Sequence, residues 1–143
     1  MTKDVYITVQ GSHIVDGTPQ EPVVTKARGK YYYRGGKHYL LYDEELEGVE
    51  QPISSVVKFN DTLLEVRKKG SLESLMVFEK DKLNVARYAT GAGTIEVGVK
   101  AADIALEEAT GRIRISVTYE MFAGCGKVQD SRVTITAVPY PFI

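Results

Sequence analysis

Few residues of this sequence carry side chains suited to catalysis or to metal binding. The chain has two histidines, His13 and His38, and one cysteine, Cys125. Cys125 and His38 could form a nucleophilic pair, because such partners are neighbours in space rather than in sequence. The alternative is that Cys125 is an ordinary loop residue between two glycines. No ligand spacing supports a four-ligand zinc site, so we predict no metal site. The sequence offers no assembled acid, base or nucleophile. We therefore predict no catalytic residues and no cofactor, and expect that the protein is not an enzyme.

Two other motifs match functional ones only in part. The segment Thr90-Gly91-Ala92-Gly93 is glycine-rich, but no Gly-Lys-Ser or Gly-Lys-Thr follows it, as a phosphate-binding loop requires. We predict a hairpin loop there. Glu107 and Glu108 are adjacent, so on a strand their side chains point to opposite faces. They cannot act as an acid and base pair across one glycosidic bond.

The clearest short-range pattern is a tyrosine-rich hairpin spanning residues 31–42. Its two β-forming runs are separated by Gly35-Gly36, which favours a two-residue primed turn. The predicted pairs are Arg34 with Lys37, Tyr33 with His38, and Tyr31 with Leu40. One face of the hairpin then carries Tyr31, Tyr33, His38, Leu40 and Tyr42. This face is either an aromatic core or the lining of a ligand cavity.

The residue pattern in the last third of the chain predicts three long strands. Residues 112–121 and 132–138 alternate between apolar and polar side chains, which is typical of strands with one buried face. Upstream, the apolar phase of residues 95–106 slips by one position near Ala102 and Asp103. We predict a β-bulge at this point. The alternative is a short helix, since residues 101–109 are good helix formers.

Similar short alternating segments precede this region from Val5 onwards. Asn60-Asp61 is a candidate two-residue turn that would pair Phe59 with Thr62. With about 8–10 strands, short connections and no convincing helix, we predict an all-β fold, a closed antiparallel meander barrel. A two-sheet sandwich is the alternative.

Length and composition fit one soluble domain covering residues 1–143. The net charge of −1 supplies no overall field to attract polyanions, so nucleic acid is an unlikely partner. No apolar run is long enough for a membrane helix, and no membrane association is expected. The single cysteine and the lack of a signal-like segment before Val5 predict a cytoplasmic protein.

Several segments, taken in order, resemble the YwiB-like family of Gram-positive bacteria. They are Arg67 to Gly70, Met76 to Glu79, Tyr88 to Thr90 with Gly93, Glu96 to Val99, and Tyr119. The resemblance spans nearly the whole chain and implies a calycin-like barrel, related in shape to lipocalins and fatty-acid-binding proteins, without an established ligand or activity. Lipocalins and avidins place a tryptophan near the barrel base, whereas this sequence has none.

The first hypothesis for function is that a small apolar or amphipathic molecule binds in the barrel interior. Its predicted ligand-binding residues are Tyr31, Tyr33, His38, Leu40, Tyr42, Tyr88 and Tyr119. The alternative is an interaction protein that forms a homo-oligomer or binds a protein partner through Tyr32, Tyr39 and Leu41. The basic residues Lys26, Arg28 and Lys30 would favour binding of an anionic metabolite or a single-stranded nucleic acid only if they converge with the tyrosines.

Overall fold

The computed structural model describes residues 3–44, 52–70, 73–90, 93–124 and 126–140. Within these ranges the regular structure consists of eleven strands, and no helix is present. The strands are β1 (Lys3–Val15), β2 (Thr18–Pro19), β3 (Val23–Arg34), β4 (Lys37–Glu44), β5 (Ile53–Phe59), β6 (Leu63–Lys69), β7 (Glu73–Glu79), β8 (Leu83–Thr90), β9 (Gly93–Ala109), β10 (Arg112–Ala123) and β11 (Gly126–Pro139).

Ten of the strands in the described part of the chain form one closed ring. Neighbours in sequence pair antiparallel from β3 to β11, and β1 pairs with both β3 and β11. The remaining strand, β2, lies outside this ring and forms a short hairpin with the end of β1. The predicted closed antiparallel meander barrel is therefore confirmed, and the sandwich alternative is wrong.

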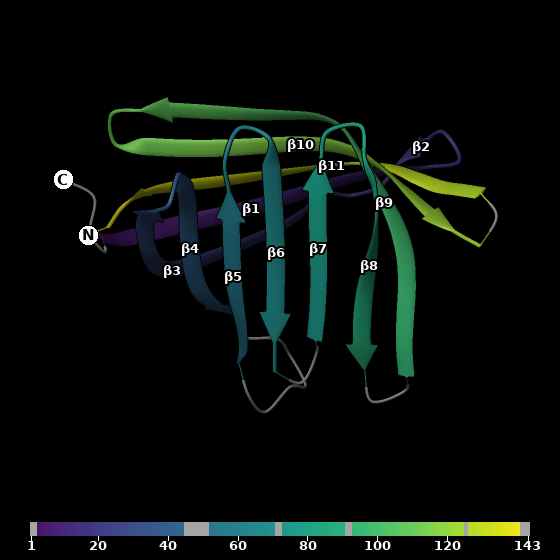
Figure 1. Ribbon diagram of the computed structural model, residues 1–143, viewed down its shortest axis with the longest axis horizontal. Coiled ribbons are helices and arrows are strands. Elements are labelled where there is room, and N and C mark those ends of the chain that lie inside the picture. Colours follow the sequence, from purple (N-terminus) through teal and green to yellow (C-terminus); the bar gives the residue numbers. More distant parts are fainter. Residues whose placement is uncertain (1–2, 45–51, 71–72, 91–92, 125, 141–143) are drawn as a thin grey trace.

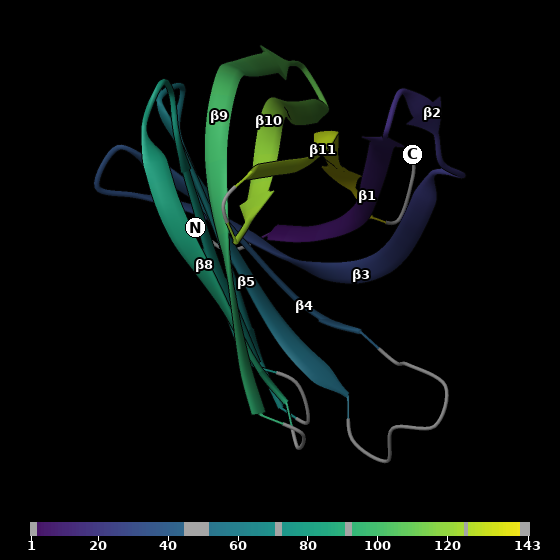
Figure 2. The same ribbon diagram turned by 90° about the vertical axis from the view of Figure 1, so that its right-hand side faces the viewer.

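The barrel is flattened, with two groups of strands that cross each other. Figure 1 shows β1, β10 and β11 running across the direction of β5 to β8. Strand β9 belongs to both groups, because it lies beside β8 in its first half and bends over to β10 in its second half (Figure 2). This bend brings the end of β9 to the barrel end where β1 begins and β11 finishes.

The bend in β9 coincides with a β-bulge. Thr118 pairs with Asp103 and Tyr119 pairs with Ala101, which leaves Ala102 without a partner on β10. An extra residue of this kind bends the bulged strand and increases its local twist. The predicted bulge near Ala102 and Asp103 is confirmed, and the helical alternative for residues 101–109 is wrong.

The register of the tyrosine-rich hairpin is also the predicted one. Arg34 pairs with Lys37, Tyr33 with His38, and Tyr31 with Leu40. Gly35 and Gly36 both have positive φ, 61° and 78°, as a primed two-residue turn requires. The register places His38, Leu40 and Tyr42 on one face, and their burial shows that this face is turned into the barrel.

The predicted turn at Asn60-Asp61 is wrong in register. Phe59 pairs with Leu64 rather than with Thr62, because the turn extends to Leu63. The side chain of Asn60 accepts a hydrogen bond from the backbone N–H of Thr62 at 2.9 Å, which stabilises the longer turn. A shift of two residues keeps every side chain on its expected face.

Inward-facing aliphatic and aromatic side chains fill the barrel. The largest of those that are fully buried, at most 1% exposed, are Phe59, Ile7, Leu40, Ile53, Leu64 and Ile115. Burying each such side chain contributes about 1.5–3 kcal/mol to folding. The middle of the barrel is therefore a packed core. The described residues form no helix that is long and apolar enough to span a membrane.

Candidate functional site

Three of the predicted ligand-binding residues lie in the packed core. Leu40 is 1% exposed, and Tyr42 and Tyr119 are 6% exposed. The ring of Tyr119 packs against Phe78, with 4.6 Å between ring centroids. Burial, and secondarily the nearby Glu44, raise the pKa of Tyr42, so its hydroxyl stays protonated. The structure thus places these side chains among the residues that fill the interior.

The other predicted residues are more peripheral. Tyr33 is 55% exposed at the tip of the β3–β4 hairpin. Tyr88 lies on β8, and its side chain is outside the described part of the structure. Tyr31 and His38 come together at one end of the barrel, where they meet a carboxylate from another strand.

Tyr31, His38 and Glu108 form a continuous hydrogen-bonded chain. The hydroxyl oxygen of Tyr31 lies 2.7 Å from Nδ1 of His38. Nε2 of His38 lies 2.8 Å from Oε1 of Glu108. The three residues belong to β3, β4 and β9, so only closure of the barrel brings them together.

Of the three residues in the hydrogen-bonded chain, Glu108 was not among the predicted ligand-binding residues. Its adjacency to Glu107 excluded a carboxylate pair but did not exclude a role for one carboxylate alone. After the bulge, Ile104, Leu106 and Glu108 alternate on one face of β9, and Glu108 pairs with the half-buried Ile113. This alternation is the signal that places Glu108 on the inward side.

The imidazole of His38 is held rigidly between aromatic rings. It is 6% exposed, stacks on Phe59 with 5.1 Å between centroids, and contacts the tilted ring of Tyr33 at 4.9 Å. Burial lowers the pKa of His38, and the carboxylate of Glu108 opposes that shift. The neutral imidazole therefore predominates at neutral pH.

The carboxylate of Glu108 selects the tautomer of that neutral ring. Because a carboxylate only accepts hydrogen bonds, Nε2 of His38 must carry the proton and donate it. Nδ1 is then an acceptor, and the hydroxyl of Tyr31 donates to it. Burial, followed by the charge of Glu108 and by Tyr33, raises the pKa of Tyr31. The phenol therefore keeps its proton and leaves its oxygen lone pairs free to accept.

We expect the pKa of His38 in the folded protein to lie below 6.5, because its burial disfavours the imidazolium. The unfolded chain then takes up a proton first as the pH falls. The free energy of unfolding should accordingly decrease as the pH drops below about 6.5. An NMR titration of the imidazole C–H resonance measures this pKa directly, and a midpoint above 6.5 would show that Glu108 outweighs burial.

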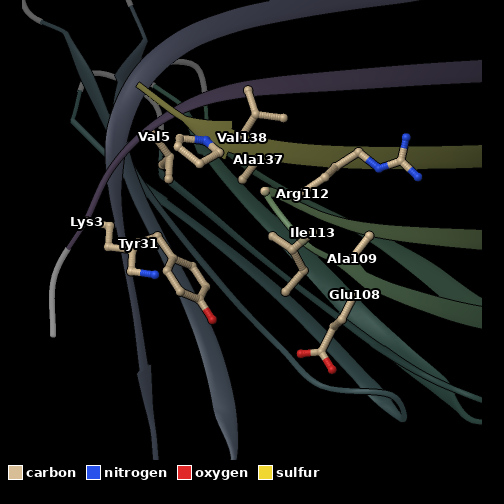
Figure 3. Close-up of a pocket in the computed structure, with 11 residues that line it drawn as sticks. Lys3, Val5, Tyr31, Glu108, Ala109, Arg112, Ile113, Ala137 and Val138 are labelled. Carbon is tan, nitrogen blue, oxygen red and sulfur yellow. The ribbon is translucent and has the colours of Figure 1, made fainter. Parts of the chain in front are cut away.

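A cavity lies beside the hydrogen-bonded chain and has a volume of about 190 Å³. It opens at the end of the barrel, between the beginning of β1 and the β9–β10 turn. Its lining residues are Lys3, Val5, Tyr31, Glu108, Ala109, Gly111, Arg112, Ile113, Ala137, Val138 and Pro139. Figure 3 shows the Tyr31 hydroxyl and the Glu108 carboxylate on one side, while the guanidinium of Arg112 points away. We call this cavity the end pocket.

The end pocket combines an apolar wall with a polar edge. Val5, Ala137 and the half-buried Ile113 supply the wall, and the first two are at most 5% exposed. Glu108, which is 61% exposed, and Tyr31 supply hydrogen-bond acceptors at the edge. Such a site can hold a small molecule with an apolar body and one polar group.

Other candidate chemistry finds no geometric support in the described residues. They contain no group of three or more His, Cys, Asp or Glu side chains positioned to hold a metal ion. The hypothetical pairing of Cys125 with His38 involves a residue, Cys125, that lies outside the described ranges. His38 itself has both ring nitrogens engaged, by Tyr31 and Glu108.

The protein is a small, closed, ten-stranded antiparallel barrel with a packed core, and the end pocket lies at its mouth. The family described as "Domain of unknown function (DUF1934)" matches residues 7–135, and the chain belongs to this family. This match, together with the similarity to the YwiB protein and its crystal structure, confirms the resemblance to the YwiB-like family.

The chain is also similar to individual proteins from the same group. It is 27% identical over 139 residues to the "Uncharacterized beta-barrel protein YwiB" of Bacillus subtilis (strain 168), and the match covers 95% of each chain. The crystal structure of the ywiB protein from Bacillus subtilis superposes with a TM-score of 0.84 at 23% identity. That superposition covers 96% of this chain and 92% of the other, and it confirms the barrel fold.

Proposed function

We propose that the protein binds a small amphipathic molecule in the end pocket, at the mouth of the barrel rather than in its middle. The observation that carries this proposal is the end pocket itself, with the Tyr31–His38–Glu108 chain along its edge. The packed core leaves Leu40, Tyr42 and Tyr119 as supporting residues rather than as ligand contacts. The proposal thus keeps the ligand class expected from the sequence but changes its position.

The hydrogen-bonded chain also specifies the head group of the ligand. Because the hydroxyl proton of Tyr31 is donated to His38, the Tyr31 oxygen can only accept a further hydrogen bond. The carboxylate of Glu108 is likewise an acceptor. The preferred head group is therefore a hydrogen-bond donor, such as a primary amine. A carboxylate head group would instead have to use Lys3, on the opposite side of Tyr31.

The proposed role is binding without catalysis, in a calycin-like cytoplasmic protein. A nucleophile or general base needs a pKa near the working pH, whereas the pKa of Tyr31 is raised. His38 cannot approach a ligand directly, because Tyr31 and Glu108 occupy its two nitrogens. Both features favour a site that orients a ligand over one that activates it.

Self-association through Tyr32, Tyr39 and Leu41 is less well supported. The rings of Tyr32 and Tyr39 stack on each other, with 4.6 Å between centroids and an interplanar angle of 7°. Both side chains are half-buried, and Lys58 lies over the ring of Tyr39. These rings therefore cover each other instead of presenting an open apolar surface to a partner.

Two probes of equal chain length and opposite charge test the proposal. We expect hexylamine to bind in the end pocket more tightly than hexanoate, measured by chemical-shift titration of the labelled protein. Tyr31→Phe removes the acceptor oxygen and should weaken hexylamine binding roughly tenfold. Tyr33→Phe is the matched control, since Tyr33 lies on the same strand and does not line the end pocket.

Each outcome of this comparison has a defined meaning. Equal affinity of the two probes, or tighter binding of hexanoate, would contradict the donor head group. Failure of both probes to shift any end-pocket resonance would contradict the binding proposal. Equal weakening by Tyr31→Phe and Tyr33→Phe would show that the Tyr31 oxygen is not the contact.

A further inference from the structure

A second cavity lies on the outer surface of the barrel, over strands β1, β10 and β11. It has a volume of about 370 Å³ and is lined entirely by polar and cationic residues. They are Gln10, Ser12, Arg114, Ser116, Arg132, Thr134 and Thr136. Among the residues that the structure describes, no carboxylate lines this cavity, which we call the outer groove. Its lining therefore carries a net positive charge.

Strand register places the two arginines at opposite ends of the outer groove. On β10 and β11, Arg114 pairs with Thr136, and Arg132 pairs with Thr118. The pair of Ser116 and Thr134 lies between them. Both arginines line the same cavity, one on each side of this middle pair along the strands.

The floor of the outer groove is made of hydroxyl groups. Ser116 Oγ and Thr134 Oγ1 lie 3.3 Å apart, so one donates to the other and leaves a hydroxyl proton to be offered outward. Gln10 and Ser12 add an amide and a hydroxyl from β1. A bound oxyanion would meet several neutral donors in addition to the two charges.

The arginines have donor capacity that the protein itself does not use. Nε of Arg114 is buried and has no hydrogen-bond partner among the described residues. Nη1 of Arg114 is 3.7 Å from the carboxylate of Glu107, which is too long for a good hydrogen bond. Arg132 makes no ion pair with any carboxylate in the described ranges. The more exposed N–H groups of the two guanidiniums are therefore the donors that a bound anion would use.

We propose that the outer groove binds the phosphate group of a small phosphate monoester. The planar fork of a guanidinium matches two phosphate oxygens, and two such forks together with hydroxyl donors are typical of phosphate recognition. This site uses the outward faces of β10 and β11, whereas the end pocket uses residues at the barrel mouth. The two sites share no lining residue, so the two proposals can be tested independently.

A monoester fits the outer groove better than a nucleic acid strand does. On β9, the neighbour of β10, the outward side chains of Asp103 and Glu107 pair with Thr118 and Arg114. Both are exposed carboxylates that would repel successive phosphates crossing the sheet. A single phosphate between Arg114 and Arg132 meets fewer carboxylates than a strand does, since Glu107 lies beside Arg114 but does not line the outer groove.

Calorimetry and chemical-shift titration with phenyl phosphate test this inference. We expect binding that shifts the resonances of Ser116, Thr134 and the two arginine side chains. Arg132→Gln and Arg114→Gln should each weaken binding roughly tenfold or more, since each removes a charge-assisted contact. Arg28→Gln is the matched control, because Arg28 lies over the Tyr140 ring and does not line the outer groove.

The remaining outcomes would overturn the proposal. Phenyl phosphate that shifts no outer-groove resonance, or that binds Arg132→Gln as well as the unmodified protein, contradicts the site. Equal loss in Arg28→Gln shows general charge attraction instead of a defined site. Tighter binding of an oligothymidylate than of phenyl phosphate, with the same resonances shifted, contradicts the monoester assignment. Thermal unfolding of each variant confirms that it is folded.

Discussion

Gly29→Ala is expected to destabilise the barrel by about 3 kcal/mol. An added Cβ would lie 2.3 Å from the backbone oxygen of Leu41 and 2.7 Å from Cδ1 of Ile7. The backbone oxygen belongs to the paired strand β4 and cannot rotate away, so β3 and β4 would have to separate. Strand β3 curves around the barrel (Figure 2), and the close backbone approach at Gly29 requires a residue without a side chain.

Urea denaturation of Gly29→Ala measures this effect, with Gly126→Ala as the matched control. A Cβ at Gly126 meets no atom within 4 Å, so that variant should stay within about 1 kcal/mol of the unmodified protein. Equal stability of the two variants would contradict the close approach of β3 to β4. Since Tyr31 follows Gly29 by two residues on β3, the same strand separation should weaken hexylamine binding in the end pocket.

Phe59→Ala should destabilise the protein by about 3–5 kcal/mol, the range found when a fully buried aromatic ring is removed. Phe59 is 1% exposed, and its ring supports His38 by stacking. The void would remove packing from the core and also let the His38 imidazole move relative to Glu108 and Tyr31. We therefore expect hexylamine affinity to fall together with stability.

Val85→Ala provides the control for Phe59→Ala. Val85 is an apolar strand residue that is 59% exposed, so its truncation should change the free energy of unfolding by no more than about 0.5 kcal/mol. A loss below about 1 kcal/mol for Phe59→Ala would mean that the barrel interior is loosely packed. The interior would then again be a candidate for the ligand site.

The sequence was sufficient to predict the features that depend on local pattern. Alternation of apolar side chains identified the strands, the Gly35-Gly36 pair fixed the register of the β3–β4 hairpin, and a slip in phase located the bulge at Ala102. The turn after Phe59 shows the limit of this reasoning. A register error of two residues is invisible in the alternation, because it moves no side chain to the other face.

The candidate site was only partly predictable, because it depends on contacts between distant strands. Tyr31 and His38 belong to one hairpin, and their shared face followed from its register. Glu108 on β9 contacts His38 only because the barrel closes. Alternation within β9 shows which way Glu108 points but not which distant strand it meets. Likewise, alternation marks Leu40, Tyr42 and Tyr119 as inward-facing, but whether such side chains line a cavity or fill it depends on how closely the strands approach.

The position of a bound ligand is the most direct test of the end pocket. Intermolecular nuclear Overhauser effects between the methylene protons of hexylamine and the protein give that position. We expect contacts to the methyl groups of Val5 and Ile113 and to the ring protons of Tyr31, which line the end pocket. Contacts to Leu64 and Ile115 in the middle of the barrel instead would contradict the packed interior and the proposed site together.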